Sequence, residues 1–236
     1  MLPGVGIGGT AARHSGLHCH AQQCAGRKEG GGGRLWRPDY LCEPTLAARE
    51  ATQEQVVAAT GATVVHPYNN RQVIIGQGTA ALELLAEAPD LDVILSPVGG
   101  GGLLSGTAIA ATELSPRIRV IAAEPAGADD AFRSLAAGKI LPADSPKTIA
   151  DGLLTSLGDL TFPIIQQRVE QIVTVSESAI IEAMKFVWER TKLIIEPSAA
   201  VPVAALWEGK LDLTGQRVGI ILSGGNVDLE RLPWQR

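Results

Sequence analysis

Four consecutive glycines constrain the fold of this chain more than any other feature of its sequence. They are Gly99, Gly100, Gly101 and Gly102. Residues 91–98 (LDVILSPV) precede them with the pattern of a buried strand, and residues 103–114 (LLSGTAIAATEL) follow with the pattern of a helix. Glycines leave backbone N–H groups open to an anion, and a helix N-terminus adds a partial positive charge. The sequence therefore predicts a strand, a phosphate-binding turn and a helix, with a plain tight turn as the alternative.

The glycine turn differs from two common nucleotide-binding motifs. It lacks the lysine of a P-loop and the GxGxxG spacing of a dinucleotide-binding fold. The expected ligand is therefore a phosphate that belongs to neither a P-loop triphosphate nor a Rossmann dinucleotide.

From Leu41 onward, strand-like apolar runs alternate with helical stretches, the first of which is predicted over residues 45–60. This alternation predicts an α/β fold with a parallel sheet. The composition, 45% hydrophobic with a net charge of -5, excludes a disordered or collagen-like chain and gives no reason to expect nucleic acid or a membrane as partner. The sequence shows no apolar run of membrane-spanning length, too few cysteines for a disulfide framework and no signal peptide, so we expect a soluble cytoplasmic protein.

A second predicted strand, residues 119–123 (RVIAA), runs into a loop with three carboxylates. Glu124, Asp129 and Asp130 supply them at the end of the strand, where oxygen ligands and a backbone carbonyl could hold Mg²⁺ or Ca²⁺. The alternative is that Asp129 and Asp130 only cap a helix that begins at Ala131. The residues alone leave both interpretations open.

A third predicted strand, residues 217–222 (RVGIIL), ends at Ser223 and two glycines. Ligands of open α/β sheets bind outside the carboxyl ends of the strands, so Ser223 and the glycine turn are expected to face one crevice. Ser223 is a candidate hydrogen-bond donor to a ring nitrogen. A helix cap or a turn is the alternative role for this serine.

Residues 1–40 have neither a helical nor a strand period and are interpreted as unpatterned. Their clustered histidines and cysteines lack the paired spacing of a zinc site; they are His14, His18, Cys19, His20 and Cys24. The glycine run at residues 30–33 has no strand before it and no apolar helix after it, so we do not interpret it as a phosphate loop.

Eight motifs follow one another along the rest of the chain. They are CEPTLAARE (42–50), VVHP (64–67), GQGT (76–79), PVGGGGLLSG (97–106), AAEPAGADD (122–130), TIADGL (148–153), ERTKLIIEPSAA (189–200) and LSGGNVDL (222–229). In this order they resemble the serine racemase and serine/threonine dehydratase group of fold-type II pyridoxal-phosphate enzymes. The resemblance implies a tryptophan synthase β-like α/β fold, with residues 70–236 as the large cofactor-binding domain and residues 41–69 as a remnant of the small domain. It also implies a homodimer that acts on serine, threonine or 3-hydroxyaspartate.

The roles of individual residues follow from this resemblance. The residues that would bind pyridoxal phosphate are Gly99, Gly100, Gly101, Gly102, Gly152 and Ser223, the last at the pyridine nitrogen, with Glu196 near the ring. The residues that would meet the substrate are Arg49, Asp151 and Thr155. A divalent cation, Mg²⁺ or else Ca²⁺ or Mn²⁺, would be held by Glu124, Asp130 and the carbonyl of Ala128.

Members of the group bind the cofactor covalently through a lysine and use a serine on the opposite ring face as acid or base, which leads to β-elimination or to racemisation. The family's Ser-x-x-x-Lys-x-Arg-Gly-Ala and Ser-Gly-Asn-His segments are absent from this chain. The lysines present instead are Lys28, Lys139, Lys147, Lys185, Lys192 and Lys210. We therefore expect an N-terminally truncated ammonia-lyase or racemase that is inactive without these segments, with a non-catalytic cofactor- and metal-binding fragment or a pseudoenzyme as the alternative.

The genetic code offers an explanation for the unpatterned head. Residues 13–24 (RHSGLHCHAQQC) can be encoded by a DNA sequence that translates as GIPAYIVMPSN when it is read from one base later. This strand-like sequence is typical of the family. The same shift through residues 25–40 permits an amphipathic helix and a strand that lead into Cys42. We therefore expect residues 1–40 to be an out-of-frame translation, with the frame restored near Leu41; a divergent N-terminus is the alternative.

Overall fold

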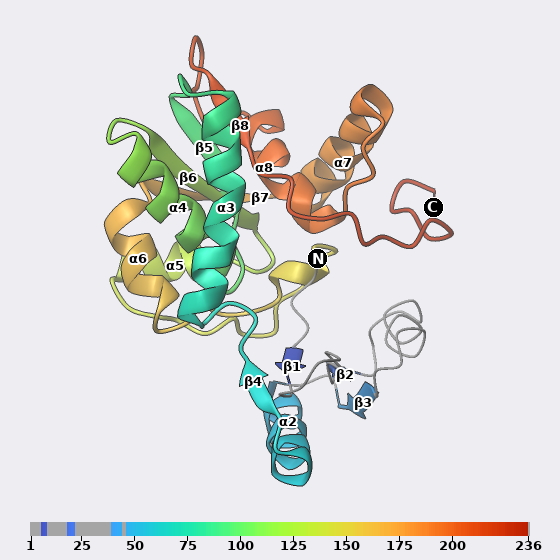
Figure 1. The fold of residues 1–236 in the computed structure, drawn as a ribbon. Helices are drawn as coiled ribbons and strands as arrows, with labels where there is room; N and C mark the ends of the chain where they lie inside the picture. Colours follow the sequence, from blue (N-terminus) through green and yellow to red (C-terminus); the bar gives the residue numbers. More distant parts are fainter. Residues whose placement is uncertain (1–5, 9–17, 22–38, 44–45, 236) are drawn as a thin grey trace. The chain divides into compact units, whose positions relative to one another are not determined.

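The computed structural model describes residues 6–8, 18–21, 39–43 and 46–235 of the chain (Figure 1). The chain divides into two compact units, Pro3–Pro67 and Tyr68–Arg236, the latter together with Met1–Leu2. The predicted domain boundary at residue 70 stays a prediction.

The first unit contains two short strand pairs and one helix. Strand β1 (Gly6–Gly8) pairs antiparallel with β4 (Thr63–Val65), and β2 (His18–Ala21) pairs parallel with β3 (Asp39–Cys42). Helix α2 (Leu46–Thr60) confirms the helix expected over residues 45–60.

The small core of the first unit forms around Val56 of α2. Its side chain is 4% exposed and packs with four partly buried side chains. They are Tyr40, Val57, Ala62 and Val64. Of the predictions for residues 1–40, those for His14, Cys24 and the glycine run at 30–33 lie outside the described residues, whereas His18, Cys19 and His20 lie in β2.

The second unit is built on a parallel sheet with the strand order β7-β6-β5-β8. Its strands are β5 (Val93–Pro97), β6 (Arg119–Pro125), β7 (Gln171–Val175) and β8 (Val218–Ile220). The structure confirms the three strands predicted at residues 91–98, 119–123 and 217–222, together with their parallel pairing. Strand β7 is an addition to the predicted strands.

Alternate side chains of the strands enter cores on opposite faces of this sheet, as the period of two requires. On β5, Ile94 packs in the cluster that includes Leu104, whereas Val93 and Leu95 pack in another cluster with Leu213. Every residue of β5 is buried, which is typical of a parallel strand covered on both faces.

Helices cover both faces of the sheet (Figure 1). The first face packs against α3 (Arg71–Glu87), α4 (Gly102–Leu114), α5 (Asp130–Ala137) and α6 (Thr161–Arg168). The second face packs against the short 3-10 helix η1 (Asp151–Leu153), α7 (Glu177–Thr191) and α8 (Pro197–Trp207). No helix within the described ranges is long and apolar enough to span a membrane.

Local sequence explains where α3 begins and how it sits on α4. The side chain of Asn70 caps α3 by accepting from the N–H groups of Gln72 at 2.8 Å and Val73 at 3.2 Å. Gly78 lies so close to α4 that an added Cβ would be 2.9 Å from the carbonyl oxygen of Gly106. The pair of glycines thus lets α3 and α4 pack directly behind the glycine turn.

Candidate functional site

The glycine turn joins the end of β5 to the start of α4, as predicted. Gly101 is the N-cap of α4 with φ +88°, a left-handed backbone conformation that glycine adopts without strain. Within the part of the chain that the structure describes, the N–H groups of Gly99, Gly100 and Gly101 donate to no acceptor. Gly100 and Gly101 are buried, and buried N–H groups are normally paired, so this turn is suited to an external anion.

Neighbouring side chains leave no room for a side chain at the turn. A Cβ on Gly102 would lie 2.8 Å from Cβ of Tyr68, and the Tyr68 ring occupies the space beside Gly100. A Cβ on Gly101 would lie 2.8 Å from Ile165 Cδ1 and 2.9 Å from Thr161 Cβ. Packing and anion access therefore both require glycine at these positions.

Helix η1, which carries two predicted site residues, lies directly against the turn. A Cβ on Gly99 would be 3.3 Å from the carbonyl oxygen of Gly152 and 3.1 Å from Cα of Leu153. Asp151 is exposed at the start of η1, and Thr155 is half-buried two residues after it ends. The structure thus places Gly152, Asp151 and Thr155 on one segment beside Gly99.

Ser198 and Glu196 connect η1 to the turn that carries Ser223. The N–H of Gly152 donates to Ser198 Oγ at 3.0 Å, and Ser198 lies in the first turn of α8. Glu196 precedes α8, is 4% exposed, and its Oε2 accepts from the N–H of Asn226 at 2.9 Å. A continuous set of contacts therefore runs from the glycine turn to the Ser223 turn.

The carboxylate loop after β6 differs from the helix cap that was one of its two open interpretations. Asp129 is the N-cap of α5, but its side chain makes no capping bond and instead accepts from Arg133 Nε at 2.8 Å. Glu124 supplies the cap: its Oε1 accepts from the N–H of Phe132 at 2.5 Å and its Oε2 from that of Ala131 at 3.3 Å. The idea that Asp129 and Asp130 only cap the helix is therefore wrong, because a residue from the preceding strand reaches these N–H groups.

Glu124 and Asp130 are both about 1% exposed. Burial raises the pKa of Glu124 to about 8, against the opposing effect of its bond from Phe132, and the nearby charge of Asp130 raises it further. Burial also raises the pKa of Asp130 to about 6, and Asp130 Oδ2 has no hydrogen-bond partner among the described residues. Two buried carboxylates, one with an unpartnered oxygen, fit a cation, although the described residues include no cluster of three or more His, Cys, Asp or Glu side chains.

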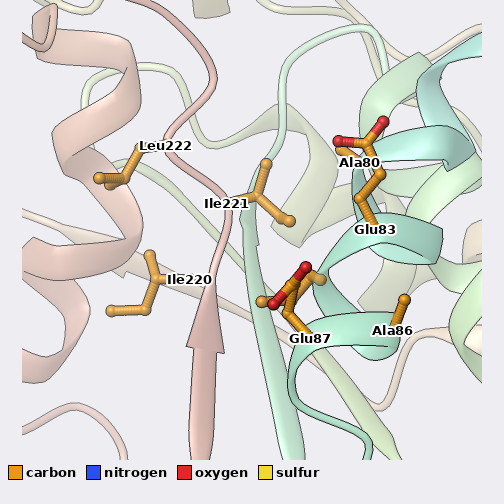
Figure 2. Close-up of a pocket in the computed structure, with 8 residues that line it drawn as sticks. Ala80, Glu83, Ala86, Glu87, Ile220, Ile221 and Leu222 are labelled. Carbon is orange, nitrogen blue, oxygen red and sulfur yellow. The ribbon is translucent and has the colours of Figure 1, made fainter.

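A groove of about 520 Å³ lies elsewhere, between α3 and the end of β8. In Figure 2, Ile221 points toward α3, whereas Ile220 and Leu222 point away from it. None of the predicted site residues lines this groove, so it does not coincide with the site at the glycine turn.

Comparison with known proteins decides which family this is. Residues 39–224 match the family described as pyridoxal-phosphate dependent enzyme. The chain belongs to this family. The resemblance and the α/β fold inferred from the motifs are thereby confirmed.

Similar proteins include racemases and a dehydratase. The chain is 49% identical over 193 residues to a beta-hydroxyaspartate dehydratase of Paracoccus denitrificans, covering 82% of this chain and 61% of that protein. It is 52% identical over 197 residues to a serine racemase of Dictyostelium discoideum, covering 81% and 60%. It resembles the structure of maize serine racemase with a TM-score of 0.88 and 41% identity, covering 93% of this chain and 68% of that one. The chain thus spans about 60% of the length of the curated relatives it matches.

Two residues of the site lie outside the predicted set, and one predicted residue belongs to the other unit. Ser198 is inside a quoted motif (residues 189–200), so that motif was the signal for it. Thr161, which contacts the glycine turn, has no sequence signal, because a threonine at a helix start is common. Arg49 lies in α2 of the first unit, and its role stays a prediction.

Proposed function

We propose that this protein is a pyridoxal-phosphate-dependent ammonia-lyase or racemase for small hydroxy amino acids. The 236 residues of the chain supply its phosphate, ring and cation contacts. The observation that carries the proposal is the group of N–H donors at Gly99, Gly100 and Gly101, which have no acceptor among the described residues and precede a helix N-terminus. A cofactor phosphate would accept hydrogen bonds from this turn.

Ser223 supplies the contact to the cofactor ring in this proposal. Pyridoxal phosphate, when bound, supplies an electron-accepting ring for the electron pair left when Cα of an amino acid loses a proton. A serine hydroxyl at the pyridine nitrogen leaves that nitrogen less protonated than a carboxylate would. Glu196 supports this arrangement because its carboxylate accepts from the N–H of Asn226 and so holds the backbone that follows Ser223.

The substrate contacts rest on position and resemblance. Asp151 begins η1 and Thr155 follows it, and η1 packs against Gly99, so a substrate beside the cofactor would meet this segment. Arg49 would bind the substrate carboxylate. Serine, threonine and 3-hydroxyaspartate share an amino acid group and a β-hydroxyl, and two similar proteins are a beta-hydroxyaspartate dehydratase and a serine racemase.

The carboxylates of Glu124 and Asp130 and the carbonyl of Ala128 would hold Mg²⁺, or else Ca²⁺ or Mn²⁺. Oxygen ligands of this kind suit hard divalent cations. A cation would also offset the burial that raises both carboxyl pKa values. The bound cation would not contact the cofactor in this proposal. It would stabilise the loop between β6 and α5.

A second candidate function, binding of cofactor and cation without catalysis, is favoured by the lysines. Every lysine in the described part of the chain is exposed, and none occupies a segment that the family uses for covalent binding. The described lysines are Lys139, Lys147, Lys185, Lys192 and Lys210. In this case the 236-residue chain binds pyridoxal phosphate without a covalent bond.

One experiment tests whether the 236-residue chain catalyses the reaction by itself. The purified chain is mixed with pyridoxal phosphate, treated with borohydride and analysed by intact mass, while serine and 3-hydroxyaspartate are assayed for keto acid and inverted amino acid. We expect noncovalent binding, no reduced adduct and no turnover from this chain. A stoichiometric adduct at one lysine with turnover would show that the chain is a complete catalyst.

The coding DNA tests the origin of the missing lysine. Sequencing from well upstream of Met1 through the codon for Cys42 is expected to recover one continuous frame with the Lys and Ser-Gly-Asn-His segments. A chain expressed from that frame should form the reducible adduct and turn over substrate. Confirmation of the present frame would favour binding without catalysis.

A further inference from the structure

We propose that Thr161 is a positioning residue for the phosphate site, because it fixes the peptide group between Gly100 and Gly101. This inference rests on the proposed function of the glycine turn. It assigns a residue of α6, far from the turn in sequence, to recognition of the phosphate group.

The hydroxyl of Thr161 has a defined hydrogen-bond arrangement. Thr161 is 0% exposed, and its Oγ1 accepts from the N–H of Gly158 at 2.9 Å. The single hydroxyl hydrogen donates to the carbonyl oxygen of Gly100 at 2.8 Å, while the carbonyl oxygen of Gly158 lies farther away at 3.2 Å. The bond to Gly100 is therefore the shorter and better of the two.

This bond determines where the next N–H points. In a planar trans peptide the C=O and the N–H of one peptide group point in opposite directions. Since the Gly100 carbonyl points at Thr161, the Gly101 N–H points away from Thr161, and it donates to no acceptor among the described residues. At φ +88° Gly101 could otherwise rotate more freely than any residue with a side chain.

The segment that carries Thr161 is itself held in place by Asn69. Asn69 Oδ1 accepts from the N–H of Leu160 at 2.9 Å, and its Nδ2 donates to Asp159 Oδ1 at 2.6 Å. Gly158 packs directly on the Asn69 side chain, where an added Cβ would not fit. The hydroxyl of Thr161 is therefore presented to the turn in one position.

Two variants of Thr161 test the proposal, with inorganic phosphate, pyridoxal phosphate and pyridoxal as probes. Thr161→Val keeps the shape and removes the hydroxyl, whereas Thr161→Ser keeps the hydroxyl. Thr161→Val removes both the bond to Gly100 and the acceptor of the Gly158 N–H. We expect the loss of the bond to Gly100 to raise the Kd of both phosphate-bearing probes by roughly tenfold and to leave pyridoxal binding unchanged. Thr161→Ser is expected to stay within about twofold of wild type.

Thr107 provides a matched control. It is also a fully buried threonine, on α4, and its hydroxyl has no partner among the described residues. Thr107→Val should leave binding of all three probes unchanged. An equal loss of phosphate affinity in Thr107→Val and Thr161→Val would overturn the proposal. Replacing any buried threonine by valine would then explain both results.

The outcomes separate this inference from the proposed function. Wild-type chain that binds phosphate while Thr161→Val binds equally well would overturn the role of Thr161 and leave the phosphate site intact. Wild-type chain that binds neither phosphate-bearing probe would overturn the phosphate site and this inference with it.

A second measurement keeps the test decisive if Thr161→Val does not fold. In wild-type chain labelled with ¹⁵N, addition of inorganic phosphate should shift the Gly101 amide signal strongly and the Gly158 amide signal little. An unshifted Gly101 signal at saturation would contradict the proposal.

Discussion

The backbone N–H of Glu196 donates to the carbonyl oxygen of Gly224 at 3.0 Å. The Glu196 carboxylate also accepts from Asn226 N–H at 2.9 Å, so one buried residue holds both sides of the turn that follows Ser223. A Cβ on Gly224 would lie 3.0 Å from Glu196 Cδ, which explains why glycine follows the serine. A residue at the start of α8 therefore holds the backbone that follows Ser223.

Glu196→Ala should loosen this turn. The variant leaves the Asn226 N–H without its acceptor, which costs about 1–3 kcal/mol of the free energy of unfolding. Glu196→Gln keeps one side-chain oxygen as acceptor and should lose less. Urea unfolding measures both, and an unchanged midpoint in Glu196→Ala would show that the carboxylate does not hold the turn.

Gly101→Ala should damage the glycine turn more than a comparable change elsewhere. The new Cβ would lie 2.8 Å from Ile165 Cδ1 at a φ of +88°. Gly209 is the matched control, because its φ is +62° and no atom lies within 4 Å of an added Cβ. Gly209→Ala should lower the free energy of unfolding only by the conformational penalty of about 1 kcal/mol. Gly101→Ala should lower it by about 1–3 kcal/mol more, because of the steric overlap, and should also abolish phosphate binding. Equal costs in thermal unfolding would contradict the packing described for Gly101.

Glu124 should make the stability of the cation-free chain fall as the pH rises. Its pKa in the folded state is raised to about 8 from an ordinary value of 4.5, so the folded chain keeps a proton that the unfolded chain releases. The contribution of this group is fully present below about pH 4.5 and is lost as the pH rises to about 8, by a few kcal/mol. Glu124→Gln should flatten this slope in urea unfolding at pH 5 and pH 8.

Glu170 is the contrasting control for this pH dependence. Its bond to Arg119 lowers its pKa, so its contribution is present above its ordinary pKa and is lost as the pH falls. Glu170→Gln should therefore leave the slope between pH 5 and pH 8 unchanged. A slope that survives in Glu124→Gln but disappears in Glu170→Gln would contradict the assignment.

Divalent cations should stabilise the chain most at a pH at which Glu124 is ionised. Binding to the folded state alone raises the free energy of unfolding by about 2.7 kcal/mol at a cation concentration of 100 Kd. We expect Mg²⁺, Ca²⁺ or Mn²⁺ to raise Tm more at pH 8 than at pH 5, and to have little effect on Glu124→Gln or Asp130→Asn. The same rise in these variants would place the cation elsewhere.

Local patterns predicted the sheet and the glycine turn because the relevant signals are short. Three of these signals lie next to each other in sequence: the buried run at residues 91–98, the glycines after it and the helical stretch at 103–114. Each one supports the prediction of a strand, a turn and a helix in that order. The residues alone left the role of Asp129 and Asp130 open, because the side chain that caps α5, Glu124, reaches it from the preceding strand. Thr161 was missed for a similar reason. It lies on α6, far along the chain from the glycine turn, and the two come together only in the folded structure.

Saturable binding of pyridoxal phosphate to the 236-residue chain tests the central claim most directly. Equilibrium dialysis should give one cofactor per chain, displaced by inorganic phosphate and abolished by Gly101→Ala. Binding that does not saturate, or that survives both inorganic phosphate and Gly101→Ala, would contradict the claim that the turn at residues 99–102 holds the cofactor phosphate.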